Sequence, residues 1–196
     1  MVIISSLHDP RLPSLYAAGA VGVLPTDTLY GLSASAGNPE AIKRLYALKN
    51  RERKPGTLIA ASVEQLIDLG LDELSLRQAA HLWPNSLSII IPAPEALFYL
   101  HQGLNSLPVR IPKDPELLEL LAKTGALATS SANHPGSLPA NNLAEAQLYF
   151  SDRVDFYVDG GDRIDRPPST VARIADGVLE VLRPGAVTIN DAGEIV

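Results

Sequence analysis

The sequence predicts an α/β fold with a mixed parallel and antiparallel sheet and flanking helices. The chain has 196 residues and is 46% hydrophobic, which suffices for the core of one domain. Short apolar runs typical of buried strands alternate with helical patterns of apolar residues. Near the carboxyl end, Asp176-Gly177 lies between two apolar runs and is a strong hairpin signal. We therefore expect a single domain over residues 1–196.

The first part of the chain predicts two helices around a buried strand. A helix is predicted at residues 12–18 and a strand at residues 20–25, whose small and β-branched side chains suit the interior of a sheet. A turn-rich loop then starts at Thr26. The next helix is expected to start at Asn38, a good N-cap followed by proline, and to end in Lys49.

The rest of the chain alternates between strands and helices up to the hairpin. Apolar segments predict strands at residues 57–61, 87–91, 107–111 and 126–129. Helical spacing of apolar residues predicts helices at residues 63–69, 74–82 and 115–122. The hairpin joins residues 170–174 to residues 178–182, and residues 162–168 are expected to form a surface loop.

Composition excludes several classes of protein. The chain has no cysteine and therefore no disulfide, thiolate nucleophile or cysteine-ligated zinc. Its four histidines lack metal-ligand spacing, and the strings of Walker ATPases and Rossmann dehydrogenases are missing, so we expect no metal site on the protein. A net charge of −6 argues against a surface that binds nucleic acid throughout but allows a local basic cleft. Since no targeting segment or membrane span is recognisable, we expect a cytoplasmic protein without a membrane partner.

Two stretches in the first third of the chain carry candidate site residues. PTDTLYG at residues 25–31 places hydroxyls, a carboxylate and a phenol directly after a buried strand, where open α/β sheets commonly bind ligands. It also suits a turn that satisfies only its own backbone. KNRERKP at residues 49–55 brings Lys49 and Arg51 to a helix end, where Lys-x-Arg could clamp phosphates. The alternatives are a helix-capping cation for Lys49 and a solvated charge run for the rest of the stretch.

Two further stretches follow. LATSSANHPG at residues 127–136 is an apolar strand that ends in hydroxyls, an amide and a glycine turn. Its hydroxyls and backbone amides could cradle a phosphate or a carboxylate, although an ordinary polar turn has the same composition. In LPVRIP at residues 107–112, Arg110 is expensive to bury unless it meets an anion. Arg110 is the best single candidate if that strand is internal, whereas on an edge strand it would face water.

Several motifs in order resemble those of the YrdC-like family, whose members include the threonylcarbamoyl-AMP synthases. They are PTDTLYGL, LKNR, PVRIP, TSSAN, STV and LRPGA, and they span residues 20–186. The family signature of Lys-x-Arg followed by Ser-x-Asn matches Lys49 with Arg51 and Ser131 with Asn133. Several motifs in the right order are far more specific than any one of them.

The resemblance implies a twisted sheet with a concave basic cleft that holds ATP and L-threonine together. It implies formation of L-threonylcarbamoyladenylate and pyrophosphate from L-threonine, bicarbonate and ATP with Mg²⁺, for N6-threonylcarbamoyladenosine in tRNA. The product would pass to a threonylcarbamoyl transferase. By motif, the resemblance implies that Lys49, Arg51 and Arg183 hold the phosphates and that Lys49 and Arg51 are catalytic. It implies that the nucleotide lies along Thr129, Ser131 and Asn133. It implies that threonine is surrounded by Thr28, Arg110 and Ser169.

Two other functions stay open on the sequence. A YrdC-like fold could bind tRNA or another RNA in its basic cleft without making the adenylate. YrdC-like domains also occur in enzymes that activate carbamoyl phosphate with ATP, generally as parts of larger chains. Two departures from the family pattern leave the geometry of the nucleotide loop open. Asn85 replaces a glycine common in relatives, and the stretch after Arg51 is about one residue shorter than in relatives.

Overall fold

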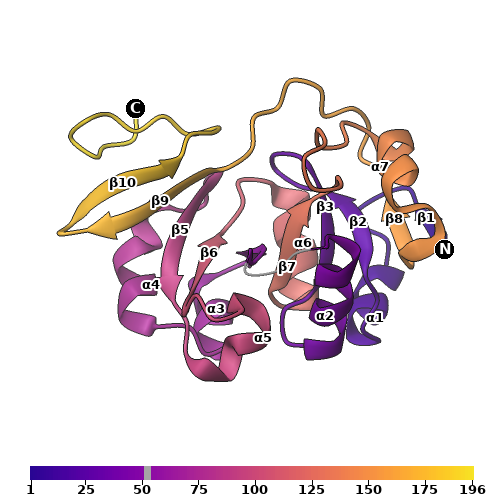
Figure 1. The fold of residues 1–196 in the computed structure, drawn as a ribbon, viewed down its shortest axis with the longest axis horizontal. Coiled ribbons are helices and arrows are strands. Elements are labelled where there is room, and N and C mark those ends of the chain that lie inside the picture. The colour runs from indigo at the N-terminus through magenta and orange to yellow at the C-terminus, as the bar shows by residue number, and fades with distance from the viewer. Residues whose placement is uncertain (51–53) are drawn as a thin grey trace.

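The computed structural model of the chain describes residues 1–50 and 54–196, in which strands and helices alternate (Figure 1). The strands are β1 (Val2–Ile4), β2 (Gly22–Pro25), β3 (Tyr30–Ser35), β4 (Thr57–Ile59), β5 (Leu87–Pro92), β6 (Ser106–Arg110), β7 (Leu127–Ser131), β8 (Phe156–Val158), β9 (Thr170–Ala175) and β10 (Val178–Arg183). The α-helices are α1 (Arg11–Ala17), α2 (Pro39–Leu48), α3 (Val63–Asp68), α4 (Glu73–Ala79), α5 (Phe98–His101), α6 (Pro115–Thr124) and α7 (Leu143–Phe150). The shorter 3-10 helices are η1 (Ala80–Leu82), η2 (Glu95–Leu97) and η3 (Ser151–Arg153).

In the described part of the chain, these strands form one sheet in the order β1-β8-β2-β3-β7-β4-β6-β5-β9-β10. The parallel pairs are β1–β8, β2–β8, β4–β6 and β5–β9. The antiparallel pairs are β2–β3, β3–β7, β4–β7, β5–β6 and β9–β10. The α/β class and the mixed sheet predicted from the sequence are therefore confirmed.

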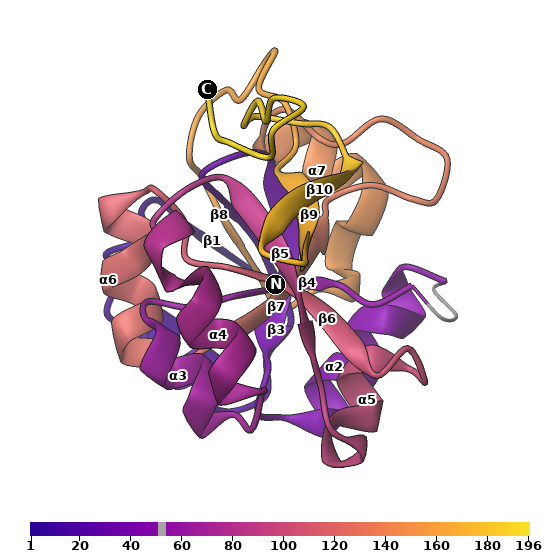
Figure 2. The same ribbon diagram turned by 90° about the vertical axis from the view of Figure 1, so that its left-hand side faces the viewer.

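Helices cover both faces of this sheet. Figure 2 shows α3, α4 and α6 on one side of it and α2, α5 and α7 on the other. Buried side chains of α1 and α6 pack together over β4 and β7 in one apolar cluster that includes Leu12, Tyr16, Ile59, Leu120 and Leu127. Burial of such apolar surface, at about 25 cal/mol per Å², is the main force that holds the helices on the sheet.

Local sequence signals set several boundaries as predicted. The Asn38 side chain accepts a hydrogen bond from the amide of Ala41 at 3.1 Å, so α2 begins after the expected N-cap, and Lys49 is its C-cap. Asp176 and Gly177 have φ values of 51° and 80°, and both positions of a type I′ turn require positive φ. The strands and helices predicted between residues 57 and 129 are confirmed, with small shifts at their ends.

The sequence patterns miss β1, β3, α5, α7 and β8, and β3 is the largest correction. The loop expected from Thr26 is only a turn, closed by the hydrogen bond from the Thr26 amide to Leu29 O at 3.0 Å. Strand β3 follows at once and pairs with β2 and β7. Its glycine, serines and alanine have weak strand preference, so its two neighbouring strands, and not its composition, hold it in the sheet.

Strand register brings the polar stretches to one edge of the sheet. Gly31 at the start of β3 lies opposite Ser131 at the end of β7. On the other side of β7, Thr129 lies opposite Thr57 at the start of β4. Residues that are far apart in the sequence therefore form one continuous polar edge.

Candidate active site

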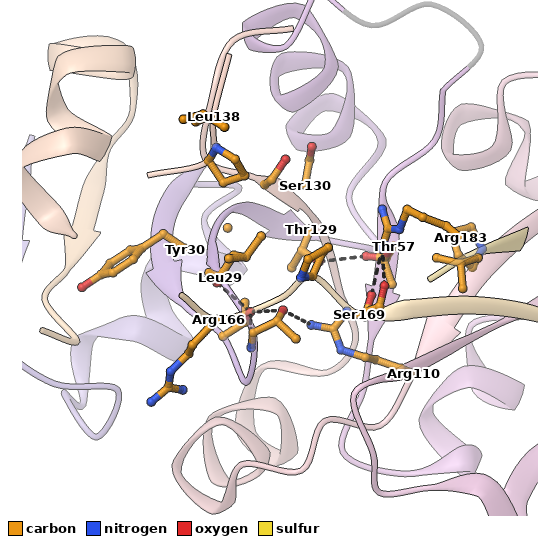
Figure 3. A pocket seen from close by; sticks show the side chains of 18 of the residues that line it. Leu29, Tyr30, Thr57, Arg110, Thr129, Ser130, Leu138, Arg166, Ser169 and Arg183 are labelled. Atoms are coloured by element: carbon orange, nitrogen blue, oxygen red, sulfur yellow. Dashed lines mark hydrogen bonds between the residues drawn. The ribbon is translucent and has the colours of Figure 1, made fainter. Parts of the chain in front are cut away.

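A cavity of about 690 Å³ lies at this edge of the sheet. Among the described residues, four basic side chains line it (Lys54, Arg110, Arg166 and Arg183) against one acidic side chain, Asp165. This matches the concave basic cleft that the resemblance implies. Six of the nine candidate site residues line this first cavity, namely Thr28, Arg110, Thr129, Ser131, Ser169 and Arg183. Figure 3 shows Arg110, Ser169 and Arg183 toward one end and Ser130 and Leu138 toward the other.

A second cavity of about 1140 Å³ adjoins the first. Lys49 and Asn133 line it, and Ser131 and Lys54 line both cavities. The structure thus brings the candidates together in two adjoining cavities that share a wall. The remaining candidate, Arg51, lies outside the described residues.

Arg110 lies in an internal strand, since β6 is flanked by β4 and β5, so the edge-strand alternative is wrong. Its Nη2 and Nε donate hydrogen bonds to Asp27 Oδ1 at 2.6 and 3.2 Å. The Arg110 and Asp27 side chains are only 4% and 2% exposed. Ser86 Oγ donates to the other carboxylate oxygen, Asp27 Oδ2, at 2.8 Å. The anion that makes the burial of Arg110 tolerable is therefore a carboxylate of the protein itself.

Two buried hydroxyls and a second guanidinium complete this end of the first cavity. Thr28 Oγ1 lies 3.5 Å from Arg110 Nη2. Ser169 Oγ lies 3.1 Å from Ser88 Oγ. Arg183 Nη2 donates to Ser169 O at 2.6 Å and lies 3.2 Å from Ser169 Oγ. These contacts fix the orientation of two cations and two hydroxyls along one wall.

The glycine of the LRPGA stretch explains how Arg183 reaches Ser169. A side chain at Gly185 would collide with the backbone of Pro168 and Ser169. The amide of Ala186 also donates to Pro168 O at 2.8 Å. Glycine therefore permits a backbone contact that holds the end of β10 against the start of β9.

Lys49 is buried, although it terminates a helix. The residue is 1% exposed and is the C-cap of α2, the position that the helix-capping alternative gave it. Its Nζ donates hydrogen bonds to Ser131 O at 2.7 Å, to Asn133 Oδ1 at 2.8 Å and to Asn133 O. The ammonium thus ties the end of α2 to the turn that follows β7, which brings the two family signatures into direct contact.

The Ser-x-Asn turn is held mainly by its own side chains. Ser131 Oγ donates to Asn133 Oδ1 at 2.7 Å, and Asn133 Nδ2 donates to Ser137 O at 2.6 Å. The backbone amides of Ala132 and Asn133 donate to Tyr30 O and Ser131 O at 2.8 and 3.0 Å. The amide cradle expected for this stretch is therefore wrong at these two positions, because both amides are used within the protein.

Comparison with known proteins decides the family. Sua5_yciO_yrdC, a family described as "Telomere recombination", matches residues 14–185. This chain belongs to the Sua5/YciO/YrdC family. The resemblance inferred from the motifs is thereby confirmed.

Named relatives of this family are similar over most of the chain. The threonylcarbamoyl-AMP synthase of Bacillus subtilis is 34% identical over 193 residues, which cover 93% of this chain and 56% of that protein. The threonylcarbamoyl-AMP synthase of Pseudomonas aeruginosa is 30% identical over 186 residues, which cover 93% of this chain and 100% of that protein.

Solved structures of the family share this fold. P. abyssi Sua5, crystallised with L-threonine, superposes with a TM-score of 0.84 at 27% identity, over 96% of this chain and 59% of that one. E. coli YciO superposes with a TM-score of 0.76 at 21% identity, over 94% and 95% of the two chains. No helix within residues 1–50 and 54–196 has both the length and the apolar character needed to cross a bilayer.

Several residues at the site were not among the candidates. Asp27 holds Arg110, and Tyr30, Ser130 and Lys54 line the first cavity. Gly160 N donates to the Tyr30 hydroxyl at 2.8 Å, and the hydroxyl donates to Gly161 O at 2.9 Å. Burial raises the pKa of Tyr30, which keeps this hydroxyl protonated. Asp27 and Tyr30 stand inside the PTDTLYG motif of the Sua5/YciO/YrdC family, so the motif itself was the available signal.

Proposed function

We propose that this chain is a threonylcarbamoyl-AMP synthase that forms L-threonylcarbamoyladenylate and pyrophosphate from L-threonine, bicarbonate and ATP, for N6-threonylcarbamoyladenosine in tRNA. The gathering of the candidate side chains carries the proposal: six line the first cavity, and Lys49 and Asn133 line the second. The names of the B. subtilis and P. aeruginosa relatives support it, as does the L-threonine in the P. abyssi crystal.

Threonine would bind at the Arg110 end of the first cavity, beside Thr28 and Ser169. A guanidinium has five N–H donors, and Asp27 occupies the Nε donor and one on Nη2. The remaining donors of Arg110 can then meet the threonine carboxylate in a fixed orientation. The two hydroxyls can donate to the substrate or accept from it, which suits a ligand that carries both an amine and a hydroxyl.

The phosphates of ATP would lie along the shared wall of the two cavities. Ser131 and Lys54 line both, and Lys49 stands directly behind this wall. In this proposal Lys49, Arg51 and Arg183 counter the phosphate charge, with Thr129, Ser131 and Asn133 along the nucleotide. Since Arg183 contacts Ser169, it stands where the phosphates and threonine meet.

The reaction proposed has two steps. The threonine amine attacks the carbon of bicarbonate, and loss of water gives the carbamate. A carbamate oxygen then forms a bond to the α-phosphorus of ATP while the bond from that phosphorus to the bridging oxygen breaks, and pyrophosphate leaves. Two anions must approach each other, so the protein contributes by positioning them and by countering their charge.

Mg²⁺ would enter this site with the nucleotide. Within the described residues, no three histidine, aspartate or glutamate side chains cluster closely enough to hold a metal ion. The side chains present fit an ion whose ligands are mainly phosphate oxygens and water. When bound, Mg²⁺ would neutralise part of the phosphate charge.

The proposal is tested by pyrophosphate release from purified chain with ATP, Mg²⁺, bicarbonate and L-threonine. We expect release that requires both threonine and bicarbonate, and less release with L-serine. Arg110→Lys should lower kcat/KM for threonine by at least about 10-fold, because an ammonium cannot hold Asp27 and a substrate carboxylate together. Arg173→Lys, an exposed arginine paired with Glu180, is the matched control and should act as the unmodified chain.

Two results would contradict the proposal. One is the absence of pyrophosphate release from the folded, unmodified chain; RNA binding under the same conditions would then favour an RNA-binding module. The other is release that continues without threonine or bicarbonate, which would indicate a different ATP-dependent reaction.

A further inference from the structure

Ser86 supports the buried pair of Arg110 and Asp27 from behind the cavity. The residue is half-buried and lies immediately before β5. Among the described residues, the wall of the first cavity includes Arg110 but not Ser86. Ser86 Oγ donates to Asp27 Oδ2 at 2.8 Å, whereas Arg110 Nη2 and Nε both donate to Oδ1, at 2.6 and 3.2 Å. One carboxylate is therefore shared between a serine on one oxygen and an arginine on the other.

This sharing sets the plane of the Asp27 carboxylate. Arginine–carboxylate pairs are frequently bidentate, with one N–H···O bond to each carboxylate oxygen. An aspartate carboxylate has a broad range of rotation about its last side-chain bond, so a donor on Oδ2 limits that rotation. With Ser86 on Oδ2, both bonds from Arg110 go to Oδ1. The serine hydroxyl thereby also sets the direction of the guanidinium.

The backbone around Ser86 is fixed to two neighbouring strands. Asn85 N donates to Ile111 O at 2.9 Å, just past the end of β6. Thr170 N, at the start of β9, donates to Ser86 O at 3.1 Å. The Ser86 hydroxyl therefore reaches Asp27 from a rigid base that is tied to the strand of Arg110 and to the strand that follows Ser169.

A fixed direction matters for Arg110 because little of it is accessible. Its side chain lines the first cavity but is only 4% exposed. A guanidinium recognises a carboxylate through donors in one rigid plane, so the fit depends on how that plane is turned. Binding groups keep their productive geometry only when hydrogen bonds behind them hold it. If Asp27 turned, Arg110 would turn with it, and its remaining donors would leave the direction of the ligand.

We infer that Ser86 is a positioning residue for L-threonine, which acts through the Asp27 carboxylate to aim the Arg110 guanidinium at the substrate carboxylate. This inference rests on the proposed function for the identity of the ligand. Ser86 itself does not contact the substrate. Its effect is on threonine and not on ATP, whose phosphates lie along the shared wall of the two cavities in the proposed function.

Calorimetric titration of the purified full chain tests the inference, with L-threonine and ATP as separate probes. Ser86→Ala should weaken threonine binding by about 3- to 10-fold and leave ATP binding unchanged, because one hydrogen bond that aligns Arg110 is lost. Ser86→Thr keeps the hydroxyl and should bind threonine within about 2-fold of the unmodified chain. In steady-state kinetics, Ser86→Ala should raise KM for threonine by the same factor and leave KM for ATP unchanged.

Two further variants separate positioning from a general effect on the fold. Ser33 is 0% exposed in β3, and its Oγ lies 2.6 Å from the Tyr16 hydroxyl and donates to Gly22 O at 3.0 Å. Ser33→Ala is the matched control, since it removes a buried hydroxyl away from the cavities and should leave threonine binding unchanged. Ser86→Cys keeps the side-chain volume but donates only weakly, so it should weaken threonine binding by at least about 2-fold. It serves as the test if Ser86→Ala does not fold.

Three results would overturn the inference. The first is threonine binding to Ser86→Ala at the unmodified affinity. The second is an equal loss of threonine and ATP binding. The third is a loss of threonine binding that Ser33→Ala reproduces, because it would indicate a general effect on the fold.

Failure of the proposed function would appear differently. It would show as missing threonine- and bicarbonate-dependent pyrophosphate release from the unmodified chain, which no titration here measures. A chain whose threonine binding depends on Ser86 but that releases no pyrophosphate would support the positioning role and reject the synthase.

Discussion

A buried cation lines each of the two adjoining cavities, Arg110 in the first and Lys49 in the second, and the protein holds the two in different ways. Arg110 is paired with the carboxylate of Asp27, so its charge is countered inside the protein. The Lys49 ammonium donates to oxygens of Ser131, the last residue of β7, and of Asn133 in the turn that follows. One cation is oriented by a buried ion pair, and the other fixes the conformation of a loop.

This difference indicates two uses of buried charge at one site. A guanidinium held by a carboxylate keeps a fixed direction and still has donors for a ligand. An ammonium among carbonyl and amide oxygens stabilises the backbone of a binding turn. Loss of the Arg110–Asp27 pair should therefore lower the stability of the whole fold and weaken threonine binding. Loss of the Lys49 ammonium should destabilise only the Ser-x-Asn turn.

The largest expected effect comes from breaking the ion pair. Asp27→Asn should lower the free energy of unfolding by about 3 kcal/mol, because it leaves the Arg110 charge buried without its carboxylate. Urea denaturation followed by circular dichroism measures this change. The double variant Asp27→Leu/Arg110→Met should regain most of that stability and still show no threonine-dependent pyrophosphate release. A double variant as unstable as Asp27→Asn would show that the pair holds the fold by packing and not by charge balance.

The next effect concerns Lys49. Lys49→Met should cost about 1 to 3 kcal/mol, because it removes hydrogen bonds from buried oxygens while the apolar stem still fills its space. Amide hydrogen exchange should become faster mainly at residues 131–137. Lys43→Met, at an exposed lysine that lines the same cavity, is the control and should change neither stability nor exchange. Faster exchange spread evenly over the sheet would contradict a local role.

The smallest expected effect concerns Arg183, which we place where the ATP phosphates meet the threonine. Arg183→Lys should lower kcat/KM for ATP by about 5-fold with little change in stability, because a single ammonium replaces a planar fork. Steady-state kinetics with ATP and with threonine varied in turn measure it. If the Michaelis constant for threonine rises while that for ATP does not, Arg183 belongs to the threonine end and the phosphate assignment is wrong.

Much of the fold could be predicted from local patterns. The N-cap at Asn38, the hairpin turn at Asp176-Gly177 and the apolar strands between residues 57 and 129 depend on nearby residues, and these predictions are confirmed. Strand β3 could not be found in this way, because its small residues have weak strand preference and only its neighbours β2 and β7 hold it in place.

By itself, the sequence determined the α/β class, the family and the order of the motifs that carry the candidate side chains. The tertiary structure alone decided which groups meet. It paired Arg110 with Asp27 across 83 residues, and it buried Lys49 against Ser131 and Asn133, which follow it by 82 and 84 positions. The physical reason is that periodicity and capping act within a few residues, whereas the partner of a buried charge depends on strand order and register.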